Sequence, residues 1–128
     1  MKLSKKKIAN GLGFLLAGAI ASAYAPTSLA GGAVDTATYN GWKTYKRQRC
    51  ETCHGATGEG SAAFPNLLES LKKLSKDDFK KTVMEGTPKG MPPHKGNKAV
   101  VENIDGLYAY LKGRSDGTIP AGELDEKK

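Results

Sequence analysis

The chain has 128 residues, with 20 basic and 13 acidic side chains and two cysteines, and this length fits one domain. Four of the lysines precede residue 8, so the excess of positive charge falls from seven to three in the rest of the chain. Such a small excess does not indicate nucleic-acid binding.

Residues 1–30 have the three-part pattern of a secretory signal peptide. A positive start at Lys2 and residues 5–7 precedes the uncharged apolar residues 8–23, and Ser28-Leu29-Ala30 supplies small residues for cleavage. The apolar stretch is shorter than the about 20 residues of a membrane helix, although an uncleaved N-terminal anchor is the alternative. We expect cleavage after Ala30, export to the periplasm and no membrane anchor in the mature chain.

The first half of the exported chain predicts helices and loops without strands. Residues 31–37 are expected to form a loose lead, followed by a helix over residues 38–49 with Trp42 and Tyr45 on one side. Residues 55–63 are rich in glycine and serine and predict a loop. A short helix is expected over residues 66–73, with Leu67, Leu68 and Leu71 pointing inward.

The second half predicts two longer helices. Ser75 is a good N-cap for a helix that ends at Gly86, and prolines and glycines make residues 87–96 an irregular, stiff loop. Asn97 is expected to cap a last helix that ends at Gly113, whose apolar stripe is Val100, Val101, Ile104, Leu107, Tyr108 and Leu111. Residues 114–128 are predicted to form a polar tail. The fold class is therefore all-α, with about four helices.

Gly106 lies inside the predicted last helix, where glycine costs about 1 kcal/mol relative to alanine. The expected reason for this glycine is the close approach of another backbone.

The motif with the clearest chemistry is Cys50-Glu51-Thr52-Cys53-His54, the C-x-x-C-H signature of covalent haem attachment. Residues three apart share one face of a helix, so two thiols at this spacing can reach the two vinyl groups on one edge of a porphyrin. The histidine that follows is then placed under the iron as an axial ligand. The pattern predicts one covalently bound haem c.

Two other interpretations of the cysteines are open. In an oxidising compartment they could form a disulfide or a thiol-oxidoreductase pair, but such motifs lie near βαβ patterns, and this sequence predicts no strands. A zinc site is less well supported, because the chain has only two cysteines and two histidines and closed zinc sites use four ligands.

The sixth iron ligand has three candidates, and an open iron face is the fourth alternative. Met91 lies between Gly90 and two prolines, and a stiff loop of this kind can hold a weak thioether ligand in place. Met84 falls on the apolar side of the helix over residues 75–86, where packing is its expected role. His94 is the other candidate. We expect His54 and Met91 to be the two metal ligands.

These features together resemble the class I c-type cytochromes over roughly residues 38–113. The shared features are a helix before C-x-x-C-H, a proline about a dozen residues later, a Met-Pro loop and a last helix that ends in an aromatic-leucine pair. Here these are Gly41 to Arg49, Cys50 to His54, Pro65, Met91-Pro92 and Tyr108-Ala109-Tyr110-Leu111. The resemblance implies a cytochrome c fold, with helices wrapped around one covalent haem.

The resemblance also implies specific contacts. The Pro65 carbonyl is expected to accept a hydrogen bond from the His54 ring, and the first and last helices are expected to cross near Gly41 and Gly106. One departure concerns the aromatic residue of the first helix, which falls four residues before the first cysteine in many relatives. Tyr45 falls five before Cys50, so either the helix is shifted or a different residue packs there.

A narrower resemblance concerns function. Residues 65–71, 90–92 and 103–112 look like those of small periplasmic cytochromes that serve PQQ-dependent methanol and alcohol dehydrogenases. This likeness implies an electron carrier and not an enzyme, with a periplasmic dehydrogenase as donor and a downstream cytochrome or oxidase as acceptor. A peroxidase-like haem enzyme with an open sixth position, or a haem-based sensor or structural module, is the alternative. No oligomer pattern is visible, so we expect a monomer.

The sequence is rich in lysines near the expected haem site. They are either a solvated face or a basic rim for an acidic redox partner. The residues concerned are Lys72, Lys73, Lys76, Lys80, Lys81, Lys89 and Lys95.

Overall fold

The computed structural model describes residues 32–128, which form five helices and two short strands. The helices are α1 (Thr36–Arg47), α2 (Glu51–His54), α3 (Leu67–Ser70), α4 (Lys76–Glu85) and α5 (Lys98–Asp116), and the strands are β1 (Ala33–Val34) and β2 (Asp125–Glu126). The all-α prediction is confirmed. The predicted signal peptide, residues 1–30, lies outside the described residues.

Short polar side chains determine where the helices begin. The Ser75 hydroxyl accepts from the Asp78 amide at 3.1 Å, and the Asn97 side chain accepts from the Val100 amide at 3.3 Å, so both predicted N-caps are confirmed. α1 begins two residues earlier than predicted, because Asp35 caps it by accepting from the Thr38 amide at 3.0 Å. α3 is shorter than predicted and ends at Ser70.

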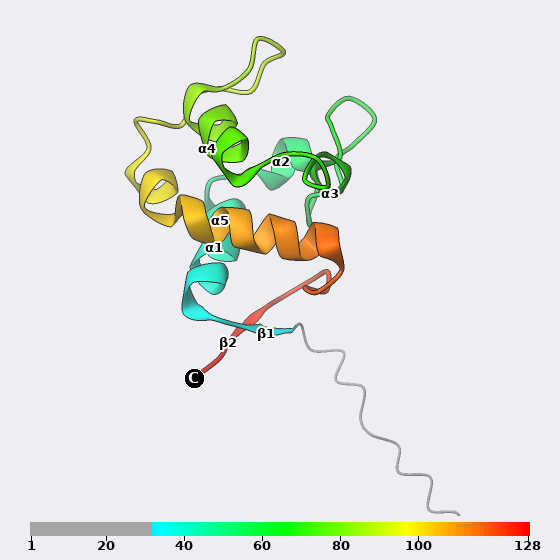
Figure 1. Cartoon of the computed structure of the whole chain (residues 1–128), viewed down its shortest axis with the longest axis vertical. Coiled ribbons are helices and arrows are strands. Elements are labelled where there is room, and N and C mark those ends of the chain that lie inside the picture. The colour runs from blue at the N-terminus through cyan, green and yellow to red at the C-terminus, as the bar shows by residue number, and fades with distance from the viewer. Residues whose placement is uncertain (1–31) are drawn as a thin grey trace, which may run out of the picture.

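α1 and α5 cross with their backbones in contact (Figure 1). A Cβ added to Gly41 would lie 2.0 Å from the Gly106 carbonyl carbon, and a Cβ on Gly106 would lie 2.0 Å from the Ala37 carbonyl oxygen. Only glycine allows this approach, so the expected crossing and the reason for Gly106 inside a helix are confirmed.

The extra residue between Tyr45 and Cys50 is absorbed after α1 ends. Arg49 has φ 59°, the one non-glycine residue in the described part of the chain with a left-handed backbone. The turn leaves Tyr45 in the crossing, where its ring meets Tyr110 edge-on with centroids 5.6 Å apart. The sequence left open whether the helix is shifted or a different residue packs at the crossing. The structure shows that Tyr45 is the packing residue.

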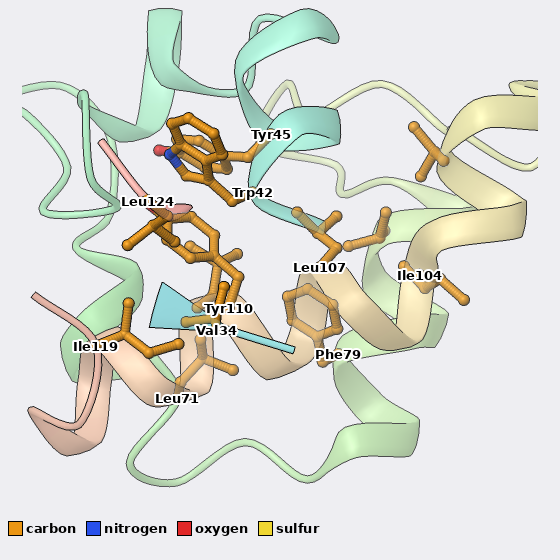
Figure 2. Packing of buried hydrophobic residues seen from close by; sticks show 13 residues of the cluster. Val34, Trp42, Tyr45, Leu71, Phe79, Ile104, Leu107, Tyr110, Ile119 and Leu124 are labelled. Atoms are coloured by element: carbon orange, nitrogen blue, oxygen red, sulfur yellow. The ribbon is translucent and has the colours of Figure 1, made fainter. Parts of the chain in front are cut away.

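The core lies on both sides of the crossing (Figure 2). Leu71 comes from the end of α3, and Phe79 and Val83 come from α4. Val34, Ile119 and Leu124 come from the two ends of the described chain. Most of the predicted α5 stripe is buried, but Val101 is 43% exposed, because it lies at the edge of the apolar face.

The C-terminal segment differs from its prediction as a polar tail. α5 does not end at Gly113, which is buried against the Ile119 side chain, but continues to Asp116, where Gly117 has φ +77°. Ile119 and Leu124 then join the core. β2 pairs in parallel with β1, aligning Ala33 with Asp125 and Val34 with Glu126, so the prediction of no strand was also wrong.

This strand pair covers the side of the crossing that faces away from α4 (Figure 1). The Thr36 hydroxyl donates to the Glu126 carboxylate at 2.6 Å and ties the start of α1 to β2. The residues before α1 are therefore packed against the end of the chain and do not form a loose lead. Between residues 32 and 128, no helix is both long and apolar enough to cross a membrane.

We predict that Gly106→Ala destabilises the protein by about 1–3 kcal/mol, because the new methyl group overlaps the Ala37 carbonyl and the helices must separate. This cost exceeds the about 1 kcal/mol that alanine gains in helix propensity. The free energy of unfolding in denaturant measures the effect. Gly96→Ala is the control, because the space around Gly96 is open. Equal stabilities for the two variants would contradict the backbone contact.

Candidate functional site

A partly open cavity lies beside the crossing, with about 540 Å³ of empty space that includes the solvent at its mouth. Almost all of its wall is apolar, and the residues that line it are Tyr45, Cys50, His54, Leu67, Leu74, Phe79, Thr82, Val83, Met91, His94, Val100, Leu107 and Leu111. A cavity of this kind fits a large apolar ligand with few polar groups.

The C-x-x-C-H motif folds as one helical turn at the edge of this cavity. Cys50 has helical backbone angles, and its carbonyl accepts from the Cys53 amide at 3.2 Å and from the His54 amide at 2.9 Å. Cys50 and His54 line the cavity, whereas Cys53 is half-buried on the same turn without lining it. The turn therefore presents the Cys50 thiol and the His54 imidazole to the cavity, and Cys53 lies on the same turn.

The electrostatics of Cys50 disfavour the interpretation as a redox dithiol. Burial raises the pKa of the Cys50 thiol to about 11. Thiol–disulfide exchange needs a thiolate, and reactive cysteines have lowered pKa values, so this thiol is a poor nucleophile at neutral pH. Among residues 32–128, no group of three or more His, Cys, Asp or Glu side chains is arranged to hold a metal ion, which gives the zinc interpretation no support.

His54 is held as a neutral imidazole. Burial lowers the pKa of His54, and the nearby Pro65 carbonyl opposes that shift. The backbone of Pro65 thus lies beside the His54 ring, as the resemblance implies, although the buried Nδ1 falls short of regular hydrogen-bond geometry. Pro65 itself is exposed and does not line the cavity. A neutral imidazole offers the lone pair that a metal ligand needs.

The loop after α4 brings Met91 to the cavity. The Thr87 amide donates to the Met91 carbonyl at 3.0 Å, and the Met91 amide donates to the Thr87 hydroxyl at 3.4 Å. Gly86 has φ +74°, and a Cβ there would lie 2.4 Å from the Met91 carbonyl oxygen, so only glycine fits at this turn. These contacts hold the Met91 backbone against the end of α4.

The structure separates the three candidates for the sixth ligand. Met91 and His94 both line the cavity with His54, whereas Met84 packs against the core and does not line it. The His94 amide donates to the Val83 carbonyl at 3.1 Å, which fixes its backbone to α4. The packing role expected for Met84 agrees with this placement.

The residues around the cavity fit a haem. Its wall is apolar, and the Cys50 thiol and the His54 imidazole of the motif line it. A thioether and a second imidazole lie on the same cavity wall as alternatives for the sixth position. The fold and this site define a c-type cytochrome, an electron-transfer protein whose cofactor is covalently bound haem c.

Comparison with known proteins shows the family. A family model described as "Cytochrome C oxidase, cbb3-type, subunit III" matches residues 36–111, and the chain belongs to this family of cytochromes. Cytochrome c-555 of Methylococcus capsulatus is 71% identical over 93 residues, which are 73% of this chain and 75% of that protein. The chain is thus an electron carrier and not an enzyme, as expected.

Two further relatives are longer than this chain. Cytochrome c-553I of Paracoccus denitrificans is 38% identical over 98 residues, covering 71% of this chain and 43% of that protein. The crystal structure of c-type cytochrome XoxG from Methylobacterium extorquens AM1 superimposes with a TM-score of 0.69 at 33% identity, covering 76% of this chain and 62% of that one. The cytochrome c fold is therefore confirmed.

Sequence reasoning did not find the polar contacts behind the motif. The Tyr45 hydroxyl donates to the Gly55 carbonyl, and the Arg114 guanidinium donates to the Thr57 carbonyl at 3.3 Å and to the Ile119 carbonyl at 3.0 Å. These side chains tie the loop after the motif to α1 and α5. The only indication in the sequence is that residue 45 is a tyrosine, although a phenylalanine would also fill an aromatic packing position.

We predict that the double variant Cys50→Ala/Cys53→Ala loses covalently retained haem, because no thioether can form. Each single variant keeps haem through one thioether. The mass of the denatured protein after expression with a haem-attachment system measures the outcome. Met84→Leu is the control and keeps the haem mass. Haem that stays bound to the denatured double variant would contradict attachment at these cysteines.

Proposed function

We propose that this protein carries single electrons in the periplasm, from a PQQ-dependent methanol or alcohol dehydrogenase to a downstream cytochrome or oxidase. The observation that carries the proposal is the meeting of Cys50, His54 and Met91 at one apolar cavity from segments about 40 residues apart. In this proposal His54 and Met91 are the two axial ligands, and Cys50 and Cys53 form the thioethers. An iron with both axial positions filled is closed to substrates and suited to electron transfer.

Each part of the chain has a separate task in this proposal. The haem supplies the reversible one-electron change of its iron. The cysteines prevent the cofactor from leaving, and the apolar wall formed by Phe79, Val83 and Leu107 excludes water. The loop contacts of Thr87 hold the Met91 backbone, which favours thioether ligation over an open position. His94 is the alternative ligand at the same wall.

The proposed donor rests on likeness to two relatives. Cytochrome c-555 and XoxG, both c-type cytochromes, support an electron-transfer role beside a dehydrogenase. The stretches 65–71, 90–92 and 103–112 support a PQQ-dependent methanol or alcohol dehydrogenase in particular. The periplasm is the compartment that fits both this donor and the signal-like pattern of residues 1–30.

The exposed lysines support a basic docking rim only in part. Lys72 pairs with Glu69 at 2.7 Å, and Lys76 and Lys80 share the Asp105 carboxylate at 3.1 and 3.2 Å. Lys73, Lys81, Lys89 and Lys95 are exposed and form no ion pair within residues 32–128. These four are the part of the predicted rim that is free to meet an acidic partner.

We predict that Met91→Ala abolishes the near-infrared sulfur-to-iron absorption band of the oxidised protein and lets carbon monoxide bind rapidly to the reduced form. Removal of the thioether opens the sixth position. Met84→Ala and His94→Ala are the matched controls and should keep the band. If the band survives in Met91→Ala and disappears in Met84→Ala, the sixth ligand is Met84. Absence of the band from the unaltered protein would contradict ligation by a methionine. Rapid carbon monoxide binding by the unaltered protein would favour a haem enzyme.

We predict that the rate of reduction by a PQQ-dependent methanol dehydrogenase falls as ionic strength rises, because salt screens the attraction between partners. Lys73→Glu combined with Lys81→Glu should slow the reaction several-fold at low salt and flatten its salt dependence. Stopped-flow spectroscopy of haem reduction measures both effects. Lys127→Glu combined with Lys128→Glu is the control with the same change in charge, since both residues follow β2, which lies on the other side of the crossing from α4 (Figure 1). Equal slowing in all variants would show that only net charge matters.

A further inference from the structure

Two tyrosines meet at the helix crossing and differ in what their hydroxyl groups do. Tyr45 on α1 and Tyr110 on α5 are both 0% exposed, with ring planes inclined at 61°. The Tyr45 hydroxyl donates to the Gly55 carbonyl, whereas the buried Tyr110 hydroxyl has no partner among the described residues. Figure 2 shows both side chains in the core. Only the first hydroxyl therefore acts on a defined group.

The group that Tyr45 contacts belongs to the peptide directly after His54. Gly55 has φ +84°, and its amide donates to the Glu51 carbonyl at 3.0 Å. The Gly60 amide donates to the His54 carbonyl at 2.6 Å. Together with the Tyr45 bond to the Gly55 carbonyl, these bonds hold three consecutive backbone groups: the His54 carbonyl, the Gly55 amide and the Gly55 carbonyl.

This backbone support adds to the contact that the His54 ring itself makes. In metal sites the second ring nitrogen of a histidine usually donates to a nearby acceptor, which fixes the orientation of the ring. Here the backbone of Pro65 lies beside the His54 ring. The Tyr45 bond acts on the other determinant of the imidazole position, which is the backbone of residues 54 and 55.

We propose that Tyr45 is a positioning residue for the haem, whose hydroxyl bond to the Gly55 carbonyl holds the His54 imidazole in place and raises the reduction potential. This inference rests on the proposed ligation by His54. Burial strongly raises the pKa of Tyr45, so the hydroxyl keeps its proton and remains a donor throughout the neutral range.

The direction of the effect follows from the charge on the carbonyl. The Gly55 carbonyl follows His54 directly in the chain, and the Tyr45 hydroxyl proton partly offsets the negative end of its dipole. Without that proton the carbonyl keeps its full dipole, which stabilises the more positive ferric state. Removal of the Tyr45 hydroxyl should therefore lower the reduction potential.

The experiment compares Tyr45→Phe with Tyr110→Phe in the haem-loaded protein. Both variants remove one hydroxyl from a fully buried ring and leave the ring in place. Spectroelectrochemical titration should give a lower potential for Tyr45→Phe and an unchanged potential for Tyr110→Phe. The paramagnetically shifted haem-methyl resonances, which report the orientation of the axial imidazole, should move in Tyr45→Phe alone.

Other outcomes of the comparison overturn the proposal. A potential that is unchanged or higher in Tyr45→Phe, or equal shifts in both variants, would mean that its hydroxyl has only a packing role. The spectra of the unaltered protein test the proposed function separately. If they show an axial ligand set without histidine, ligation by His54 fails whatever the tyrosine variants do. If they show histidine and methionine, only the role of Tyr45 is at stake.

Discussion

The contact between the backbones of α1 and α5 at Gly41 and Gly106 is the constraint on which the rest of the structure depends. It brings Tyr45 from one helix and Leu107 and Leu111 from the other to the wall of the same cavity. The C-x-x-C-H motif follows α1 after two residues, so the position of α1 decides where the cysteines and the imidazole lie. The crossing therefore places the haem site as well as the core.

The cavity takes up apolar surface that would otherwise be buried in the core, so a bound cofactor would complete the packing. A chain of this length buries a modest core, and here the apolar residues that would otherwise face one another line a space of about 540 Å³. Its two sides come from the C-x-x-C-H turn and from the loop at Met91, each fixed by hydrogen bonds to near neighbours in sequence. Local contacts build the two halves, and the crossing brings them together.

This division explains which features could be predicted from the sequence. The caps Ser75 and Asn97, the haem motif and Gly106 depend on local rules or on a spacing within one turn, and the structure agrees with each. The pairing of β1 with β2 joins residues about 90 apart and depends on two buried side chains, Ile119 and Leu124, in a segment that is otherwise polar. Composition alone could not distinguish that segment from a solvated tail.

The apolar wall and the ligands act on the iron in the same direction. Ferric haem carries one more positive charge than ferrous haem, and an apolar environment penalises charge, so burial beside Phe79 and Val83 favours the reduced state. Thioether ligation from Met91 in the proposed site also raises the potential relative to stronger donors. In the role proposed for Tyr45, the negative end of the Gly55 carbonyl opposes both effects by favouring the oxidised state, and the Tyr45 hydroxyl weakens that opposition. The reduction potential of this carrier thus depends on polar groups near the haem, because a hydrogen bond to such a group weakens its electrostatic effect on the iron.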